Sequence, residues 1–274
     1  MSPSRLTLER MSLNQITVEQ CTLAEVIEAC GRAGITVIGP WRHKVAEIGL
    51  EDAARRIRAA GLRVSSLCRG GFFPAADAAG IRAADADNRR AVEEAATLGT
   101  DVLVLVCGPP VGRDVERARM QILRGIEKLV PHAEDAGVRL GIEPLHPMMI
   151  SERSAIVTLG EANDLAERFD AHRVGVVVDA YHVWWDPRLR EEIARAGRRI
   201  FGYHVADWLV PTTDRLEGRG MMGDGMIDLR GIRAAVEGAG YDGPIEVEVI
   251  NRDAWSAPGD EIVARACAAF LAAA

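Results

Sequence analysis

Residues 174–186, VGVVVDAYHVWWD, place Asp179 directly after a short apolar run. Runs of this kind are typical of buried parallel strands, and a carboxylate at the end of one is costly to bury without a partner. The same arrangement recurs in RLGIE, IFGYH and PIEVE, which end at Glu143, His204 and Glu248. Because all four groups stand at strand ends, the sequence predicts that four strands bring three carboxylates and one imidazole together.

Apolar runs and amphipathic segments alternate along the rest of the chain. Strands are predicted over residues 12–17, 35–39, 64–69, 101–108, 139–144, 174–180, 200–207 and 244–250. Helices are predicted over residues 23–33, 51–60, 88–98, 115–136, 159–169, 189–196, 229–239 and 260–271. An uninterrupted series of this kind favours a closed α/β barrel over an open doubly wound sheet. We therefore expect one single-domain (β/α)₈ TIM barrel spanning residues 1–274.

Glycines and irregular stretches support this division. Gly34 and Gly99 follow predicted helices directly, as expected where a helix ends in a left-handed residue. The sequence contains neither G-x-G-x-x-G after the first strand nor G-x-x-x-x-G-K-[ST], which argues against a nucleotide site of the usual kind. The least regular stretches follow predicted strands, on the side where barrel enzymes carry their chemistry. They are residues 40–50, 70–81, 147–157 and 209–228.

Composition limits the classes of partner. The net charge of −7 argues against nucleic-acid and anionic-membrane binding, since both require a basic face. Residues 1–18 lack the apolar core of a secretory signal, and no apolar run is long enough to span a bilayer. The 5 cysteines are scattered without a C-x-x-C pair, which favours buried thiols in a reduced compartment. We expect a cytoplasmic protein; homo-oligomerisation stays open.

The strand-end groups predict a metal site. Side chains alternate along a strand, so Glu143, Asp179, His204 and Glu248 converge if each faces the barrel mouth. Three carboxylates there would repel one another unless a cation lay between them. Oxygen ligands with one imidazole suit Mn²⁺ or Mg²⁺, with Zn²⁺ or Co²⁺ as alternatives. The competing interpretation is that each acid caps its strand or pairs with an arginine.

Glu246 stands two residues before Glu248 and should lie one layer deeper in the barrel. We expect the small residues Gly141 and Gly202 to leave room for it. In that place Glu246 would accept hydrogen bonds as a buried carboxylate rather than bind metal. A shift of register would exchange the two glutamates, and the residues alone leave this alternative open.

Several aromatic side chains accompany the predicted site. His182 follows Asp179 by three residues and is placed to reach a substrate hydroxyl from the loop after its strand. Trp184 and Trp185 would either wall a pocket or pack beneath a loop. His146 follows the fifth strand and is a further candidate for substrate contact.

Basic side chains near the predicted mouth are candidates for binding a substrate oxygen. Arg219 precedes a glycine-rich loop, and Arg215 is its rival for the same role. Arg69 ends the third predicted strand, where it would either offset the acids from inside the mouth or form a structural salt bridge. Asp207 would orient an imidazole or a positively charged group.

These residues together resemble the xylose-isomerase-like TIM barrel superfamily, in particular its sugar phosphate isomerase/epimerase group. The resemblance covers nearly the whole chain and is most specific in IEPLHP, VVVDAYHVWWDP, RGMMGDGMIDL and GYDGPIEVEV. It implies that Glu143, Asp179, His204 and Glu248 bind one divalent metal ion. It also implies a substrate contact for His182. The G-Y-x-G motif from Gly240 favours Glu248 over Glu246 as the ligand.

The resemblance implies an enzyme of carbohydrate metabolism that acts on a small molecule. Glu143 and Glu248 would exchange protons with opposite faces of a carbon through a metal-bound ene-diolate. Isomerisation or epimerisation of a keto-sugar or related polyol is the first hypothesis. A lyase or dehydratase acting on a cyclic keto-polyol or 3-keto-glycoside would use the same ligands. A non-catalytic sugar-binding barrel is the alternative from another class.

Overall fold

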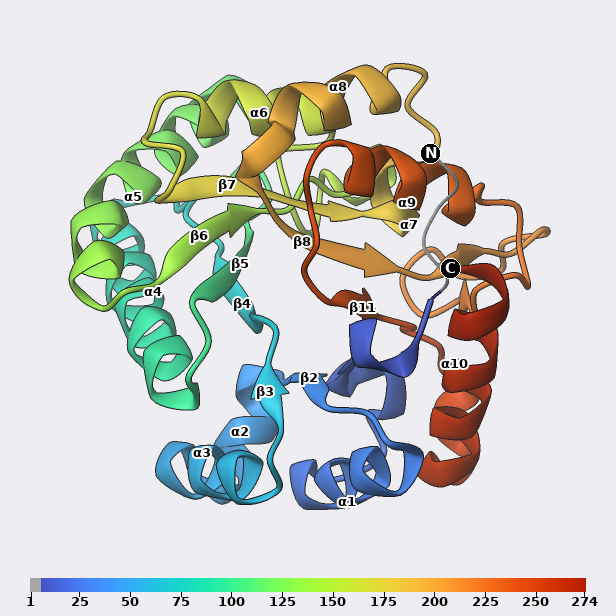
Figure 1. Ribbon diagram of the computed structural model, residues 1–274. Helices are drawn as coiled ribbons and strands as arrows, with labels where there is room; N and C mark the ends of the chain where they lie inside the picture. Colours follow the sequence, from blue (N-terminus) through green and yellow to red (C-terminus); the bar gives the residue numbers. More distant parts are fainter. Residues whose placement is uncertain (1–5) are drawn as a thin grey trace.

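The computed structural model describes residues 6–274 and contains a ring of parallel strands enclosed by helices (Figure 1). Residues 1–5, which the predictions for the barrel and for the N-terminal segment include, lie outside the described residues. The strands are β1 (Met11–Asn14), β2 (Val37–Gly39), β3 (Arg63–Val64), β4 (Leu67–Gly71), β5 (Val102–Val106), β6 (Arg139–Ile142), β7 (Val174–Asp179), β8 (Ile200–Val205), β9 (Asp207–Trp208), β10 (Arg219–Gly220) and β11 (Ile245–Val247). The helices are α1 (Leu23–Ala33), α2 (Arg42–Ile48), α3 (Leu50–Ala59), α4 (Ala78–Leu98), α5 (Val115–Asp135), α6 (Leu159–Ala166), α7 (Ala180–Val183), α8 (Leu189–Ala196), α9 (Leu229–Gly238) and α10 (Gly259–Ala273).

The strand order confirms the predicted (β/α)₈ barrel. It runs β3-β2-β1-β11-β8-β7-β6-β5-β4, and each neighbouring pair is parallel. The last strand of the ring, β11, pairs with the first, β1. The two ends of the order, β3 and β4, follow each other in sequence and are joined through Ser65 and Ser66. The chain itself therefore completes the ring.

The third predicted strand, residues 64–69, is broken into β3 and β4. β3 pairs with β2, whereas β4 pairs with β5. At the break, the hydroxyls of Ser65 and Ser66 donate hydrogen bonds to Glu246 Oε2 at 2.7 and 3.1 Å. Two consecutive side chains thus reach the same buried carboxylate, which the alternation of a continuous strand would not allow.

Helix boundaries agree with the sequence at some ends and differ at others. α1 and α8 have the predicted limits, and Gly34 and Gly99 end α1 and α4 in left-handed conformations with φ of 73° and 82°. α4 begins ten residues earlier than predicted because the Asp77 side chain accepts a hydrogen bond from Gly80 N and caps the helix. The short helices α2 and α7 lie in stretches where no helix was predicted.

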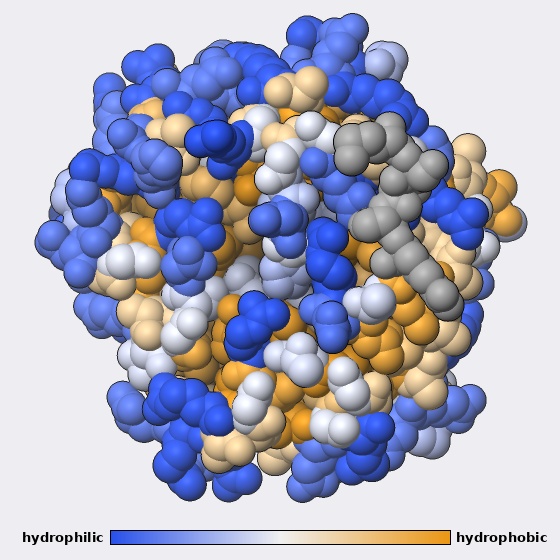
Figure 2. Space-filling model, in the orientation of Figure 1, coloured by the Kyte–Doolittle hydropathy of each residue, from blue (hydrophilic) through white to orange (hydrophobic). Residues whose placement is uncertain are grey.

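Apolar side chains fill two layers, one inside the barrel and one between the strands and the helices. The inner layer beneath the mouth contains Cys68, Val104 and Val177. On the face shown in Figure 2, hydrophilic residues dominate the periphery, and apolar residues are visible toward the centre. Cys30, Cys68 and Cys107 are buried as predicted, whereas Cys21 and Cys267 are half-buried. None of the helices in the described part of the chain is long and apolar enough to cross a membrane.

Candidate metal centre

Four side chains meet at the C-terminal ends of adjacent strands. Asp179 ends β7, His204 lies near the end of β8, and Glu143 and Glu248 follow β6 and β11 directly. The order β11-β8-β7-β6 makes these strands consecutive neighbours, and Asp179 is in register with His204. One potential ligand atom from each residue lies within 4.8 Å of the others. The structure therefore brings together the four predicted metal ligands.

Burial opposes the ionised forms of these acids. The exposed fractions are 4% for Glu143, 0% for Asp179 and 3% for Glu248. Burial raises the pKa of the Glu143 and Glu248 carboxyls above their usual values, and it raises the pKa of Asp179 to about 6. Burial therefore favours the protonated acids, and a positive group placed among them would stabilise the ionised carboxylates.

The His204 imidazole lies between two of the buried acids. Its Nδ1 is 3.2 Å from Glu143 Oε1, and its Nε2 is 3.7 Å from Glu246 Oε2. Burial lowers the pKa of His204, but the charges of Glu246 and Glu143 outweigh this effect and raise it to about 10. Among the described residues, neither ring nitrogen nor Glu143 Oε1 makes a hydrogen bond of good geometry. Buried nitrogen and oxygen atoms that lack hydrogen-bond partners are available as ligands, as expected of a site that holds a cation.

Arg219 provides a positive charge beside the cluster. It lies in β10, which pairs antiparallel with β9, and only 2% of it is exposed. Its Nη1 donates to Asp179 Oδ2 at 3.0 Å and to Glu248 Oε2 at 2.8 Å. The guanidinium carbon also lies 4.5 Å from the centre of the Tyr181 ring. Arg215, the rival candidate, is exposed, and its backbone oxygen accepts a hydrogen bond from Tyr181. Arg219 is therefore the arginine that contacts the cluster.

His182 lies against Arg219, in α7 rather than in the predicted loop. His182 Nε2 is 3.1 Å from Arg219 Nη2 and 3.5 Å from Asp179 Oδ2. Its Nδ1 accepts a hydrogen bond from the backbone N–H of His146 at 3.2 Å. Burial and the charge of Arg219 lower the pKa of His182 well below its usual value. The ring is therefore neutral at physiological pH.

Aromatic rings surround the same end of the barrel. The His146 ring stacks on Trp208 with centroids 4.9 Å apart and meets Trp185 edge-on at 5.7 Å. The Trp185 indole donates to the backbone oxygen of His182 at 2.9 Å. Tyr181 also packs against Trp208, with centroids 4.9 Å apart. His146 and Trp185 thus belong to one aromatic cluster beside the carboxylates.

Arg69 packs on an aromatic ring, and Asp207 has a role other than the predicted one. The Arg69 guanidinium lies over the Phe72 ring, 3.9 Å from its centre. Burial lowers the pKa of Arg69 from its usual value. The expectation that Asp207 orients an imidazole or a cation is wrong, because its oxygens accept hydrogen bonds from backbone N–H groups of the following loop. The donors are Trp208, Gly223, Gly225 and Ile227.

Glu246 is the deep hydrogen-bonded carboxylate that the strand alternation predicts, with only 2% of its surface exposed. Besides the serine hydroxyls, it accepts a hydrogen bond from Asn14 Nδ2 at 2.7 Å. The expected source of space was wrong. A Cβ atom on Gly39 would overlap Glu246 Oε1, whereas Cβ atoms on Gly141 and Gly202 would meet Val177. Gly39, which has no side chain at the end of β2, therefore creates the room for Glu246.

Sequence reasoning missed Asn14, which lies beside Glu246 and Glu248, and Trp41, which lies beside Asn14. Asn14 ends β1 and donates to Glu246 and Glu248, and the Trp41 indole donates to Asn14. A polar residue at the end of the first apolar strand was an available signal for Asn14. Nothing local in the sequence indicates the contact with Trp41, which follows β2.

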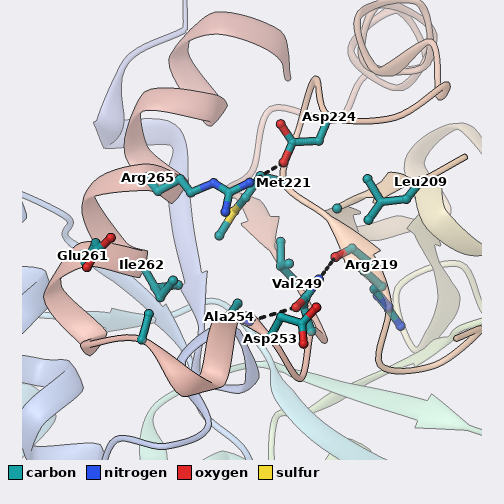
Figure 3. A pocket seen from close by; sticks show the side chains of 13 residues that line it. Leu209, Arg219, Met221, Asp224, Val249, Asp253, Ala254, Glu261, Ile262 and Arg265 are labelled. Carbon is teal, nitrogen blue, oxygen red and sulfur yellow. Dashed lines mark hydrogen bonds and ion pairs between the residues drawn. The ribbon is translucent and has the colours of Figure 1, made fainter. Parts of the chain in front are cut away.

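A separate cavity of about 300 Å³ lies next to Arg219. Figure 3 shows that the Arg219 side chain turns away from this cavity, while its backbone oxygen accepts a hydrogen bond from Asn251. Asp224 and Arg265 form an ion pair across another part of the wall. None of the four strand-end residues lines the cavity, so it is distinct from the carboxylate cluster.

The fold and the cluster define a class of protein, parallel α/β barrels with a candidate cation site at the C-terminal ends of their strands. Within that class, the chain belongs to the xylose isomerase-like TIM barrel family, whose sequence model matches residues 24–273. Family membership confirms the resemblance inferred from the motifs.

The similar proteins include an enzyme related in sequence and a solved structure that covers nearly the whole chain. A 3-dehydroshikimate dehydratase of Pseudomonas aeruginosa is 33% identical over 168 residues, which are 59% of this chain and 25% of the relative. The chain thus spans about a quarter of that relative. A crystal structure of protein SMc04130 from Sinorhizobium meliloti 1021 has 50% identity and a TM-score of 0.94, covering 96% of this chain and 98% of the other.

Two more distant structures share the fold. The IOLI protein, whose crystal structure is described with a zinc atom, has 21% identity and a TM-score of 0.83, with 96% of each chain covered. D-psicose 3-epimerase, described in the presence of D-fructose, has 17% identity and a TM-score of 0.76, with 95% of this chain and 96% of the other covered. At these identities the likeness establishes the barrel alone.

Proposed function

We propose that this protein is a divalent-metal-dependent isomerase or epimerase that acts on a keto-sugar or related polyol. The observation that carries the proposal is the buried cluster of three carboxylates and one imidazole, in which atoms of Glu143 and His204 have no hydrogen-bond partner within residues 6–274. Its position at the C-terminal ends of the strands is where barrel enzymes carry out their chemistry. Membership of the xylose isomerase-like family supports an enzyme.

Glu143, Asp179, His204 and Glu248 would hold the cation. Three oxygen ligands with one imidazole suit Mn²⁺ or Mg²⁺, and Zn²⁺ or Co²⁺ also accept this donor set. A bound cation supplies positive charge beside a substrate carbonyl oxygen and so lowers the free energy needed to remove a proton from the neighbouring carbon.

Glu143 and Glu248 are the proposed proton-transfer groups. They follow the two outer strands of the series β11-β8-β7-β6, so β8 and β7 lie between them. A substrate bound in the mouth would have one glutamate on each side, as epimerisation requires. Burial raises the pKa of both carboxyls toward neutral pH, which brings them nearer to the range suited to a general base and a general acid.

The remaining groups would bind and orient the substrate. His182 and Arg219 lie beside Asp179 and would contact substrate hydroxyl or carbonyl oxygens. His146 and Trp185 would contact the carbon skeleton or exclude water from the mouth. Arg69, in the middle of β4, is the proposed contact from the other side of the barrel.

Dehydration is the second candidate reaction, favoured by the 33% identity to a 3-dehydroshikimate dehydratase. In this reaction, one glutamate would take a proton from the carbon next to the carbonyl. The hydroxyl on the next carbon would then leave as water with a proton from the other glutamate, and a double bond would form between the two carbons. The substrate would be a cyclic keto-polyol or a 3-keto-glycoside, the latter losing its aglycone instead of water.

Incubation of Mn²⁺-loaded protein with ketoses, cyclic keto-polyols and 3-keto-glycosides tests both candidates. In H₂O we expect a product of the same mass as the substrate, and in D₂O we expect one deuterium on the epimerised carbon. A product lighter by one water or by an aglycone would replace the isomerase with the lyase. Conversion without deuterium incorporation into product or recovered substrate would refute proton transfer and favour hydride transfer. Absence of conversion across the panel together with absence of metal binding would refute the enzyme proposal.

A further inference from the structure

The Glu248 carboxylate is held from two sides. Its Oε2 accepts from Arg219 Nη1 at 2.8 Å, on the side of the carboxylate cluster. Its Oε1 accepts from Asn14 Nδ2 at 3.3 Å, on the side of β1. The two contacts together restrict the orientation of the Glu248 carboxylate.

The orientation of the Asn14 amide is fixed by its neighbours. Its Oδ1 accepts from the Trp41 indole N–H at 2.7 Å and from the backbone N–H of Ile16 at 3.0 Å. Both of these groups are donors only. On the other side, its Nδ2 faces the acceptor oxygens of Glu246 and Glu248. A flipped amide would place oxygen against two carboxylates and nitrogen against two donors, so one orientation is strongly favoured.

Two of the four partners of Asn14, Glu246 and Trp41, are themselves anchored. Glu246 Oε1 takes the shorter bond from Asn14, at 2.7 Å, and Glu246 Oε2 is held by the serine hydroxyls of the broken strand. The Trp41 ring packs on the apolar layer formed by Cys68, Val104 and Val177. Asn14 is 0% exposed, so water does not compete for these hydrogen bonds.

We propose that Asn14, locked by Trp41, is a positioning residue that orients Glu248 for metal binding and proton transfer. The assignment rests on the proposed function in that it takes Glu248 as a ligand and base. Asn14 is not one of the four proposed ligands, so its proposed role is to act through Glu248. Hydrogen-bond partners that orient a ligand carboxylate commonly change metal affinity by about 10–100-fold when they are removed.

Co²⁺ titration of purified variants, followed through visible absorption, tests the proposal without a substrate. Asn14→Ala should raise the dissociation constant for Co²⁺ by about 10–100-fold and change the absorption spectrum. Trp41→Phe, which keeps a ring but removes the indole N–H, should produce a smaller loss in the same direction. Wild-type affinity and spectrum in both variants would overturn the proposal. If Asn14→Ala does not fold, Trp41→Phe alone decides by the same criterion.

Asn163→Ala is the matched control. Asn163 is 1% exposed in α6, and its amide donates to the backbone oxygen and to Oε2 of buried Glu192, at 2.9 and 3.0 Å. This variant should lower the melting temperature but leave Co²⁺ affinity and spectrum unchanged. An equal loss of affinity in Asn163→Ala would show a general structural effect and contradict the positioning role.

Crystal structures of the metal-free variants separate this inference from the proposed function. In Asn14→Ala or Trp41→Phe, the Glu248 carboxylate should leave the orientation it has in the wild type; an unchanged carboxylate would refute the inference even if no metal binds. Conversely, Co²⁺ binding that depends on Asn14, without turnover of any ketone, would refute the reaction and leave the positioning role standing.

Discussion

At the scale of single residues, buried charge is the dominant feature of the site. Glu248 and Asp179 both form ion pairs with the guanidinium of Arg219, whereas Glu143 lies against the imidazole of His204. Burying several carboxylates is unfavourable unless opposite charge or hydrogen bonds stabilise them. The side chains around this centre therefore act chiefly by supplying or orienting charge.

Glu248→Gln should remove turnover and keep most of the metal affinity. The amide retains an oxygen ligand but cannot accept the substrate proton, so we expect turnover to fall by roughly 100-fold or more. Glu192→Gln, at a glutamate that is 2% exposed in α8, is the control and should keep full turnover. Steady-state kinetics with parallel metal titrations measures both effects. Full activity in Glu248→Gln would reject the two-glutamate scheme.

Metal affinity should rise with pH. The pKa of His204 is raised to about 10 in the metal-free protein, so at pH 7–9 a cation must displace a proton from its imidazole. Removal of that proton becomes easier as pH increases, and affinity should grow about tenfold per pH unit in this range. Below pH 6, protonation of Asp179, whose pKa is raised to about 6, should weaken binding further.

Calorimetric titrations in buffers of different ionisation enthalpy measure the proton release directly. We expect about one proton per cation near pH 8. Affinity that stays constant between pH 7 and pH 9, without proton release, would contradict the protonated state of His204.

At the scale of elements, short parallel strands and their ends specify the site. The two-residue period of β11 places Glu246 below Glu248, and pairing with β8 brings Glu246 into register with His204. Local alternation was sufficient to predict the four strand-end groups, whereas the order of Glu246 and Glu248 also required the motif that begins at Gly240. The hydrogen bonds of Asn14 to the glutamates join residues more than 230 positions apart and depend on barrel closure.

Other features escaped prediction for related reasons. The break between β3 and β4 depends on the contacts of Ser65 and Ser66 with Glu246, a partner at the other end of the chain. Arg219 was found as a candidate, but its ion pair with Asp179 requires the β9–β10 hairpin, whose two-residue strands give no periodic signal. Local patterns predicted the elements, whereas long-range contacts decide their details.

Gly39→Ala should disturb the element that accommodates Glu246. A methyl group at this position of β2 would overlap Oε1 of Glu246 in β11. Overpacking of this kind destabilises a folded protein by about 1–3 kcal/mol. Gly31→Ala is the control, because a Cβ there meets nothing within 4 Å in α1 and should stabilise the helix by about 0.5–1 kcal/mol. Denaturant unfolding measures both variants. Equal stability of Gly39→Ala and the wild type would contradict the close approach.

At the scale of the whole molecule, closure of the barrel assembles a site from distant parts of the chain. β1 pairs with β11, and α1 lies beside α10 (Figure 1). The first strand thus supplies Asn14 to glutamates that the last strand delivers. A cation that binds the closed barrel and not the unfolded chain would stabilise the whole fold through this site.

Saturating Mn²⁺ should therefore raise the melting temperature. At a free concentration one hundred times the dissociation constant, binding contributes about 2.7 kcal/mol. For a chain of this size we expect a shift of roughly 5–10 °C. His204→Ala should abolish most of the shift, since it removes the single imidazole ligand. Thermal unfolding with and without Mn²⁺ measures the effect, and an equal shift in wild type and variant would place the ion elsewhere.

The location of the cation is tested most directly by anomalous scattering from a crystal soaked in Mn²⁺. We predict a single strong peak bounded by Glu143, Asp179, His204 and Glu248, with one ligand atom of each at about 2.0–2.3 Å. A peak at any other place, or no peak at millimolar Mn²⁺ with these side chains ordered, would contradict the central claim.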